Sequence, residues 1–214
     1  MILDVRAAPP FYKNGYLLGC ETTREGVLID PGEEVVDLLE LVDLRQLRIT
    51  AILLTHAHLD HITGVARAKR ELGAPVYLHR DDLPLYNGAV QQGLMFGIRV
   101  EPQPRVDCFY EPGQVIRFGE YELRVHHTPG HCPGGVCLEV GRSGDSARQL
   151  FVGDTLFAGS IGRTDLPDGH YETLIRSIRD VLFSFPDETE VYSGHGPMTT
   201  IGQERATNPF LVGV

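Results

Sequence analysis

The stretch that most constrains the fold of this chain is Thr55-His56-Ala57-His58-Leu59-Asp60-His61, which directly follows an apolar run at residues 49–54. The apolar run predicts a buried strand, and residues 62–72 carry apolar side chains at helical spacing. The polar cluster is therefore expected on a strand-to-helix connection. Catalytic and binding groups collect on connections of this kind.

Four metal-competent side chains, His56, His58, Asp60 and His61, lie within this short loop. A loop that bends into a helix turns His56 and His58 toward one point, and Asp60 and His61 toward a second point nearby. Imidazole and carboxylate groups suit zinc, iron and similar ions, so the spacing predicts two adjacent metals. The alternative is a polar loop whose histidines only cap the helix. Chance matches are usually isolated ligand pairs, so four ligands favour a metal site.

The composition limits the class of protein and its partners. With 19 basic and 29 acidic residues the formal net charge is -10, which disfavours a nucleic-acid partner. The longest apolar run is too short to cross a bilayer, and residues 1–16 lack the pattern of a secretory signal. The four cysteines form no C-x-x-C pair. We expect a single domain, residues 1–214, in the cytoplasm, with free thiols and no membrane partner. The sequence leaves the oligomeric state open.

Apolar periodicity and turn signals predict the order of helices and strands. Strands are expected at residues 1–5, 15–20, 26–30, 49–54, 75–79, 106–110, 115–118, 120–127, 135–140, 149–153 and 190–193, the first three as an antiparallel meander. Helices are expected at residues 35–42, 62–72, 81–93, 169–185 and 201–207. The second half repeats the first half's scheme of strands before a helix. Two packed β-sheets with helices outside follow, so the fold class is α+β and the architecture a four-layer αββα sandwich.

Three further polar residues, His131, Asp154 and His195, each follow an apolar strand and a glycine. Strand ends are where such folds place their chemistry. A lone Asp after a strand is more often a helix cap or a turn residue. Together with the first cluster, however, the three favour metal ligands. His79 is predicted to be structural, and His127 to orient the turn before His131.

Taken together, the predicted ligands and their flanking residues resemble the metallo-β-lactamase superfamily. The resemblance is carried by T-H-x-H-x-D-H at residues 55–61, His127-Thr128-Pro129-Gly130-His131, Gly153-Asp154-Thr155 and Ser193-Gly194-His195. It implies the αββα sandwich and two divalent metal ions, zinc in the first place, with iron or manganese as alternatives. It also implies that His56, His58 and His131 hold one ion, that Asp60, His61 and His195 hold the other, and that Asp154 bridges them.

Within the superfamily, the residues at 162–167 and 207–211 resemble the glyoxalase II group and its relatives, which include persulfide dioxygenases. Asp154 stands where the β-lactamases usually have cysteine, which disfavours that branch. The resemblance implies a hydrolase that cleaves a small-molecule thioester, such as S-D-lactoylglutathione, through a hydroxide bridging the metals. Asp60 and Asp154 would be catalytic, and Arg163 would bind a substrate carboxylate.

The chain departs from full-length glyoxalase II in two respects. It ends soon after Asn208, which predicts no C-terminal helical domain, and Asp165 and Gly196-Pro197 stand where that enzyme has aromatic contacts to glutathione. We therefore expect weaker binding of the glutathione moiety than in full-length glyoxalase II.

Several alternatives remain at the level of the sequence. Arg163 can instead pair with Asp165 or Asp168. Cys132, beside His131, can tune the metal or simply be a small buried residue, which we favour. The alternative function is a mononuclear iron oxygenase acting on glutathione persulfide, since two histidines and one carboxylate can hold Fe(II). A non-catalytic metal or redox module ranks below both.

Overall fold

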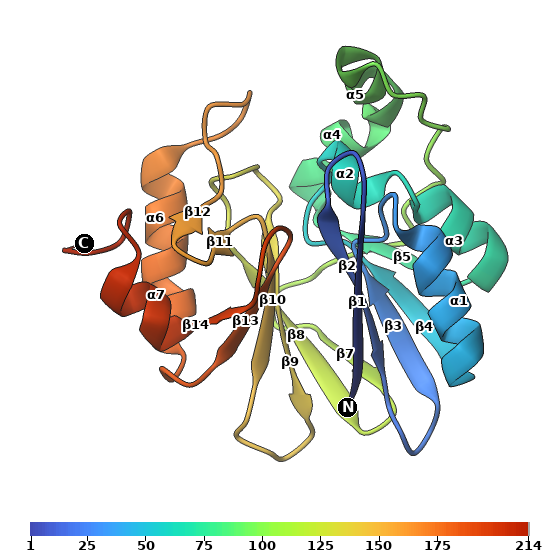
Figure 1. Cartoon of the computed structure of the whole chain (residues 1–214), viewed down its shortest axis with the longest axis horizontal. Coiled ribbons are helices and arrows are strands. Elements are labelled where there is room, and N and C mark those ends of the chain that lie inside the picture. Colours follow the sequence, from blue (N-terminus) through green and yellow to red (C-terminus); the bar gives the residue numbers. More distant parts are fainter. Residues whose placement is uncertain (214) are drawn as a thin grey trace. The chain divides into compact units, whose positions relative to one another are not determined.

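The computed structural model describes residues 1–213, and the chain divides into two compact units. The first unit comprises residues 1–110 and 117–120, and the second comprises residues 111–116 together with the chain from Tyr121 onward. Each of two six-stranded sheets belongs mainly to one unit (Figure 1). Mixed sheets with helices agree with the predicted α+β class.

The sheet of the first unit has the strand order β1-β2-β3-β4-β5-β6. Its strands are β1 (Ile2–Ala8), β2 (Lys13–Gly19), β3 (Glu25–Ile29), β4 (Arg48–Leu53), β5 (Val76–Leu78) and β6 (Cys108–Phe109). The first three pair antiparallel, which confirms the predicted meander, and the later pairs are parallel. Parallel neighbours need long crossovers, and helices between the strands supply them.

The helices of the first unit are α1 (Val35–Arg45), α2 (Leu59–Ile62), α3 (Val65–Leu72), α4 (Leu83–Asn87) and α5 (Ala89–Phe96), with a 3-10 turn η1 (Arg80–Asp82). Two predicted helices, at 62–72 and 81–93, are each divided. The first is interrupted because Gly64 donates its N–H to the carbonyl of Pro31 at 3.1 Å. The second is interrupted at Gly88, which caps both α4 and α5. Glycine is the residue most able to change direction in this way.

The sheet of the second unit has the order β14-β13-β10-β9-β8-β7. Its strands are β7 (Val115–Phe118), β8 (Tyr121–His127), β9 (Val136–Arg142), β10 (Gln149–Gly153), β13 (Glu190–Ser193) and β14 (Thr199–Thr200), and β11 (Leu156–Phe157) and β12 (Ser160–Ile161) form a small separate sheet. The helices are α6 (Tyr171–Asp180) and α7 (Ile201–Thr207), with a 3-10 turn η2 (Leu182–Ser184). The helix predicted at 169–185 is shorter because the chain tightens into η2 after Asp180.

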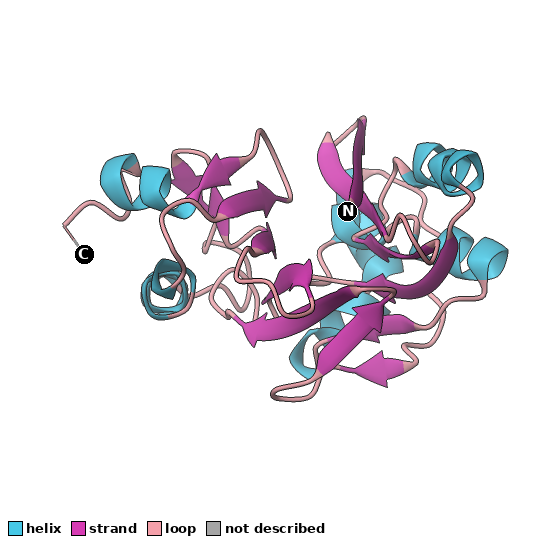
Figure 2. Ribbon diagram, turned by 90° about the horizontal axis from the view of Figure 1, so that it is seen from below, coloured by secondary structure: helices cyan, strands magenta, loops and turns pink. Residues whose placement is uncertain are grey.

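Each unit has its own apolar core between its sheet and its helices. In the first unit Leu28 and Ile52 from the strands pack in one cluster with Leu38 from α1. In the second unit Leu150 and Val191 cluster with Leu174 from α6. Figure 2 shows the helices of both units beside their strands, from a second direction. These cores fix the strand ends, where the polar residues of interest begin.

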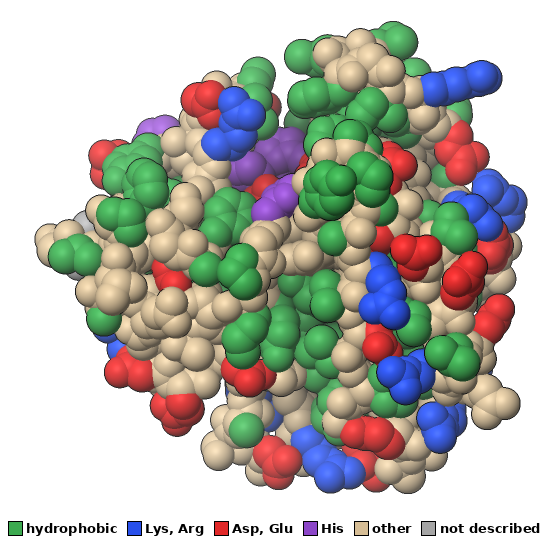
Figure 3. Space-filling model, in the orientation of Figure 1, with side chains coloured by type: hydrophobic (Ala, Val, Ile, Leu, Met, Phe, Trp, Pro, Cys, Tyr) green, Lys and Arg blue, Asp and Glu red, His purple; other side chains and the backbone are tan. Residues whose placement is uncertain are grey.

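Apolar side chains also gather on the surface of the first unit, over α5 and the β1–β2 turn (Figure 3). Tyr12, Leu94, Met95 and Phe96 are all exposed, and the rings of Phe11 and Phe96 meet edge to face, with centroids 5.8 Å apart. Contiguous exposed apolar side chains are typical of contact surfaces for ligands or partners.

Among the described helices, none combines the length and apolar character needed to cross a membrane.

Candidate metal centre

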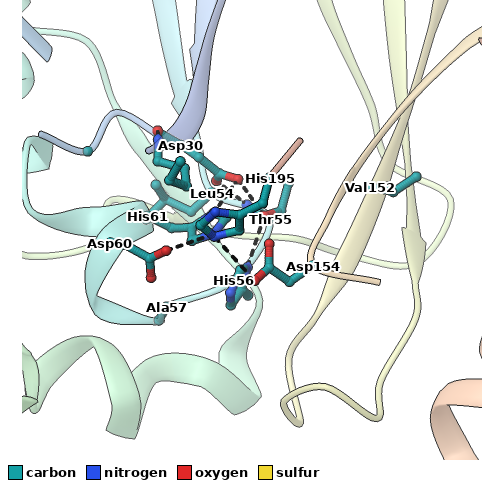
Figure 4. Close-up of polar contacts among 12 residues, drawn as sticks. Asp30, Leu54, Thr55, His56, Ala57, Asp60, His61, Val152, Asp154 and His195 are labelled. Atoms are coloured by element: carbon teal, nitrogen blue, oxygen red, sulfur yellow. Dashed lines mark hydrogen bonds and ion pairs between the residues drawn. The ribbon is translucent and has the colours of Figure 1, made fainter. Parts of the chain in front are cut away.

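The first part of the loop after β4 is held by a buried carboxylate, that of Asp30, which directly follows β3 (Figure 4). Asp30 Oδ1 accepts from the backbone N–H of Thr55 at 2.7 Å, and Oδ2 accepts from the Thr55 hydroxyl at 2.5 Å. The same Oδ2 lies 2.9 Å from His61 Nδ1. The Thr55 hydroxyl oxygen in turn lies 3.1 Å from His56 Nδ1. Asp30 therefore orients His61 directly and His56 through Thr55.

These contacts decide which ring nitrogen of each histidine can bind a metal. The ionised Asp30 only accepts, so His61 carries its proton on Nδ1. The Thr55 hydroxyl gives its proton to Asp30 and accepts from His56 Nδ1. In both rings Nε2 then carries the lone pair, as in metal-binding histidines whose other nitrogen donates to a carboxylate or a hydroxyl. The donor set therefore fits a metal ion.

The four predicted ligands of the loop lie close together. The rings of His56 and His58 stand at 90° with centroids 4.9 Å apart, and those of His56 and His61 are 4.0 Å apart. Asp60 Oδ2 lies 3.7 Å from His61 Nε2. Asp82, which is fully buried, accepts from the N–H of Ala57 at 2.9 Å, between the first two histidines. The structure thus gathers the set that the spacing predicted.

In the second unit the parallel pairing of β10 with β13 brings two of the predicted ligands side by side. Asp154 follows β10 and His195 follows β13, and the N–H of Gly194 donates to the carbonyl of Gly153 at 2.8 Å. Asp154 Oδ2 lies 3.7 Å from His195 Nε2 and 3.7 Å from His131 Nε2. Two ligand atoms on one tetrahedral metal are about 3.4 Å apart, so these separations suit shared coordination.

The segment Gly162-Arg163 packs tightly behind this second set. The carbonyl of Arg163 lies 2.8 Å from His131 Nδ1, which places the lone pair of that ring on Nε2 as well. Gly162 makes the approach possible, because a Cβ at this position would lie 1.9 Å from the carbonyl oxygen of Asp154. Any larger residue at 162 would displace the segment from both His131 and Asp154.

The side chain of Arg163 pairs with Asp165, one of the alternatives considered for it. Arg163 Nε and Nη2 donate to the two carboxylate oxygens of Asp165 at 2.7 and 2.8 Å. The hydrogen bond from Arg163 lowers the pKa of Asp165 to about 2. Both side chains are exposed, so the guanidinium can exchange this partner for a ligand at little cost. Its role in binding substrate stays a prediction.

Several other polar residues have structural roles. His79 accepts from the N–H of Asp81 at 3.3 Å and caps η1, as a structural histidine would. His127 Nε2 lies 2.8 Å from the carbonyl of Pro133, across the turn that leads to His131. Cys132 is buried, in agreement with the favoured interpretation. Burial raises the pKa of the Cys137 thiol to about 11.

Sequence reasoning missed Asp30 and Asp82. Asp30 is the last residue of the strand expected at residues 26–30, and a carboxylate at a strand end is also a candidate for orienting a ligand. Asp82 carried no signal, because its contact with Ala57 depends on the path of a later segment.

The sequence model described as "Metallo-beta-lactamase superfamily" matches residues 8–195. Among curated proteins, the hydroxyacylglutathione hydrolase GloC of Haemophilus influenzae is 34% identical over 99% of this chain and 98% of its own length.

Three solved structures are similar. A crystal structure of the BLEG-1 B3 metallo-β-lactamase has a TM-score of 0.88 and 36% identity, covering 99% of this chain and 100% of that one. TTHA1623 in a di-iron-bound form has a TM-score of 0.85 and 43% identity, covering 97% and 100%. ETHE1 from Myxococcus xanthus has a TM-score of 0.79 and 30% identity, covering 98% and 84%.

Proposed function

Because the chain belongs to the metallo-β-lactamase superfamily, whose sequence model spans residues 8–195, we propose that it is a binuclear metallohydrolase acting on a thioester such as a hydroxyacyl-glutathione. The observation that carries this proposal is the likeness to the GloC hydrolase along nearly the whole of both chains. The two ligand sets, with their rings oriented through Nδ1, support it.

We assign the ligands as the family resemblance implies. His56, His58 and His131 would hold one ion, Asp60, His61 and His195 would hold the other, and Asp154 would serve both. The equal separations of Asp154 Oδ2 from the two histidines of its own unit support the bridging role. Zinc is the first candidate, and the di-iron form of the similar TTHA1623 supports iron as an alternative. Manganese is the remaining one.

Two bound cations would lower the pKa of a shared water toward neutrality and polarise the thioester carbonyl. The protein's own groups have the task of positioning. Asp60 and Asp154 would accept hydrogen bonds from the water and aim it at the carbonyl carbon. Asp30 and the carbonyl of Arg163 keep the histidine rings from turning, so the site is preorganised for the charge that develops. Arg163 would hold a substrate carboxylate.

Two other functions have specific support. The likeness to ETHE1, and a set of two histidines and one carboxylate in the second unit, favour the iron oxygenase acting on glutathione persulfide. The likeness to a B3 metallo-β-lactamase means that Asp154 in place of cysteine does not by itself argue against a β-lactam substrate.

The test combines metal analysis with three assays on one preparation. The apo protein is reconstituted with zinc, iron or manganese and should approach two ions per chain. It is then given S-D-lactoylglutathione, glutathione persulfide under an oxygen electrode, and a chromogenic cephalosporin. We expect thioester cleavage with zinc and without oxygen uptake, and a high KM because Gly196-Pro197 offers glutathione no aromatic contact. The proposal would be refuted, in favour of the oxygenase, if the Fe(II) form and no other consumed oxygen with glutathione persulfide while the thioester stayed intact.

A further inference from the structure

A buried ion pair lies behind the metal loop of the first unit and has no part in the assignments above. Lys13 Nζ and Glu34 Oε1 are 2.6 Å apart, and each side chain is only 1% exposed. Lys13 begins β2, and Glu34 directly precedes α1. Removing two charges from water is costly, and apolar residues of similar volume often stabilise a protein equally well. Stability alone therefore does not explain why charges stand here.

The two charges hold the turn formed by residues 30–32 at both of its ends. Lys13 Nζ donates to the backbone carbonyl of Asp30. Glu34 Oε1 accepts from the N–H of Gly32 at 2.8 Å. Asp30 has a φ of +48°, a left-handed conformation that is strained for a residue with a side chain. The ion pair is therefore a support that keeps this strained turn in place.

The same turn contacts the short helix α2, which carries Asp60 and His61. The Asp30 carboxylate binds His61 Nδ1 at 2.9 Å. Gly32 packs directly against the helix, since a Cβ there would lie 2.1 Å from the carbonyl oxygen of Asp60. The carbonyl of Pro31 accepts from Gly64, just after the helix, at 3.1 Å. Any shift of the turn would move both ligands.

We propose that the Lys13–Glu34 pair positions Asp60 and His61, the two ligands that α2 supplies. The pair thereby sets the affinity for the second metal ion, the one assigned to Asp60, His61 and His195. The inference rests on the proposed two-metal centre. The ligands of the other ion depend on the pair less directly, because Asp30 reaches His56 only through Thr55 and the His56-Ala57-His58 stretch has a further support in Asp82. Loss of the pair should therefore weaken the two metal-binding steps unequally.

The main variant is Lys13→Met/Glu34→Gln. It removes both charges together, so no unpaired charge is left buried, and the amide oxygen of the new side chain can still accept from the N–H of Gly32. Glu34→Gln alone is the second variant, for use where the double variant does not fold; it leaves Lys13 charged, with the carbonyl of Asp30 and the new amide oxygen as its partners. The control is Val42→Ala on α1, a buried residue of the apolar core that makes none of these hydrogen bonds.

Each metal-free protein is titrated with zinc, and separately with manganese, against a chromophoric chelator, and its thermal midpoint is measured in chelator. We expect the charge variants to lower the affinity for the second ion about 10- to 100-fold, and to leave the affinity for the first ion within about threefold of wild type. The control should lower the thermal midpoint and leave both affinities unchanged.

Two results would overturn the inference while the two-metal proposal stands. One is a charge variant that binds both ions as tightly as wild type. The other is an equal loss at both steps that tracks the thermal midpoint, as a purely structural role would give. A wild-type chain that takes up a single ion would overturn the two-metal centre, and this inference with it.

Discussion

Asp30→Asn replaces one carboxylate oxygen by an NH2 group at the residue that orients His61 and, through Thr55, His56. The carboxylate accepts from the Thr55 N–H, the Thr55 hydroxyl and His61 Nδ1. In the variant the amide oxygen can keep the bond to the Thr55 N–H, while the NH2 group replaces Oδ2. The Thr55 hydroxyl can rotate and accept from this group. His61 can accept from it only by moving its proton to Nε2, the nitrogen that the metal needs.

The size of the effect follows from this competition. To bind a metal, His61 must return its proton to Nδ1, where it then faces the NH2 group instead of a carboxylate. The metal-bound state thus loses one hydrogen bond to a charged group, worth about 1.5–3 kcal/mol. At about 1.4 kcal/mol per factor of ten, binding at His61 should weaken about 10- to 150-fold. The fold should remain, because the variant keeps the size and shape of the side chain.

The assay is a zinc titration of the metal-free protein against a chromophoric chelator, with ¹⁵N NMR of the imidazoles to report the His61 tautomer. Asp107→Asn is the matched control: Asp107 accepts from the N–H of Val76 at 2.8 Å in the same unit and contacts no assigned ligand. The reasoning would be refuted by zinc affinity within about threefold of wild type in Asp30→Asn, or by an equal loss in the control.

Three further predictions concern the ligands, the exposed arginine and the pH dependence of stability. Metal titration should show that His58→Ala loses one ion, whereas Asp154→Ala lowers occupancy of both, and equal losses would remove the bridging role. Arg163→Met should raise KM about tenfold with kcat unchanged. An unaltered KM would show that Arg163 pairs with Asp165 and does not bind substrate. The hydrogen bond from His126 lowers the pKa of Glu139, so its contribution to stability is complete above the ordinary pKa of Glu and is lost as pH falls below it. Urea unfolding between pH 6 and about 3 should therefore show a smaller acid loss in Glu139→Gln than in wild type, and parallel curves would contradict this.

Local signals account for most of what the sequence predicted. The loop from Thr55 to His61 holds four predicted ligands within six residues, so no knowledge of distant contacts was needed to find them. His131, Asp154 and His195 needed the whole set to be seen together, because each alone is an ordinary strand-end residue. Most of the strands that were found are long enough for their periodicity to show; β5 and β6, with three and two residues, are the exceptions.

What could not be predicted depends on contacts between distant segments. The division of α2 from α3 follows from the bond between Gly64 and Pro31, which no local pattern reveals. The two-residue strands β11, β12 and β14 are too short to have a period. The ion pair of Lys13 and Glu34 joins two segments whose charges read as ordinary surface residues. The layering of two sheets with helices outside was predicted from the order of strands and helices, and the division of the predicted ligands between two ions came from the family resemblance.

The parallel pairing of β10 with β13 has a consequence for the order in which metal is acquired. The predicted ligands of the loop are close together along the chain, so they can meet at one ion without the pairing of distant strands. His131, Asp154 and His195 become neighbours only after β8, β10 and β13 have found one another, and pairing of this non-local kind is slow. An ion captured early also stabilises the unfolded chain and so contributes less to the final stability. During refolding with metal present, uptake should therefore begin before the chain is native and finish only when the second sheet has formed.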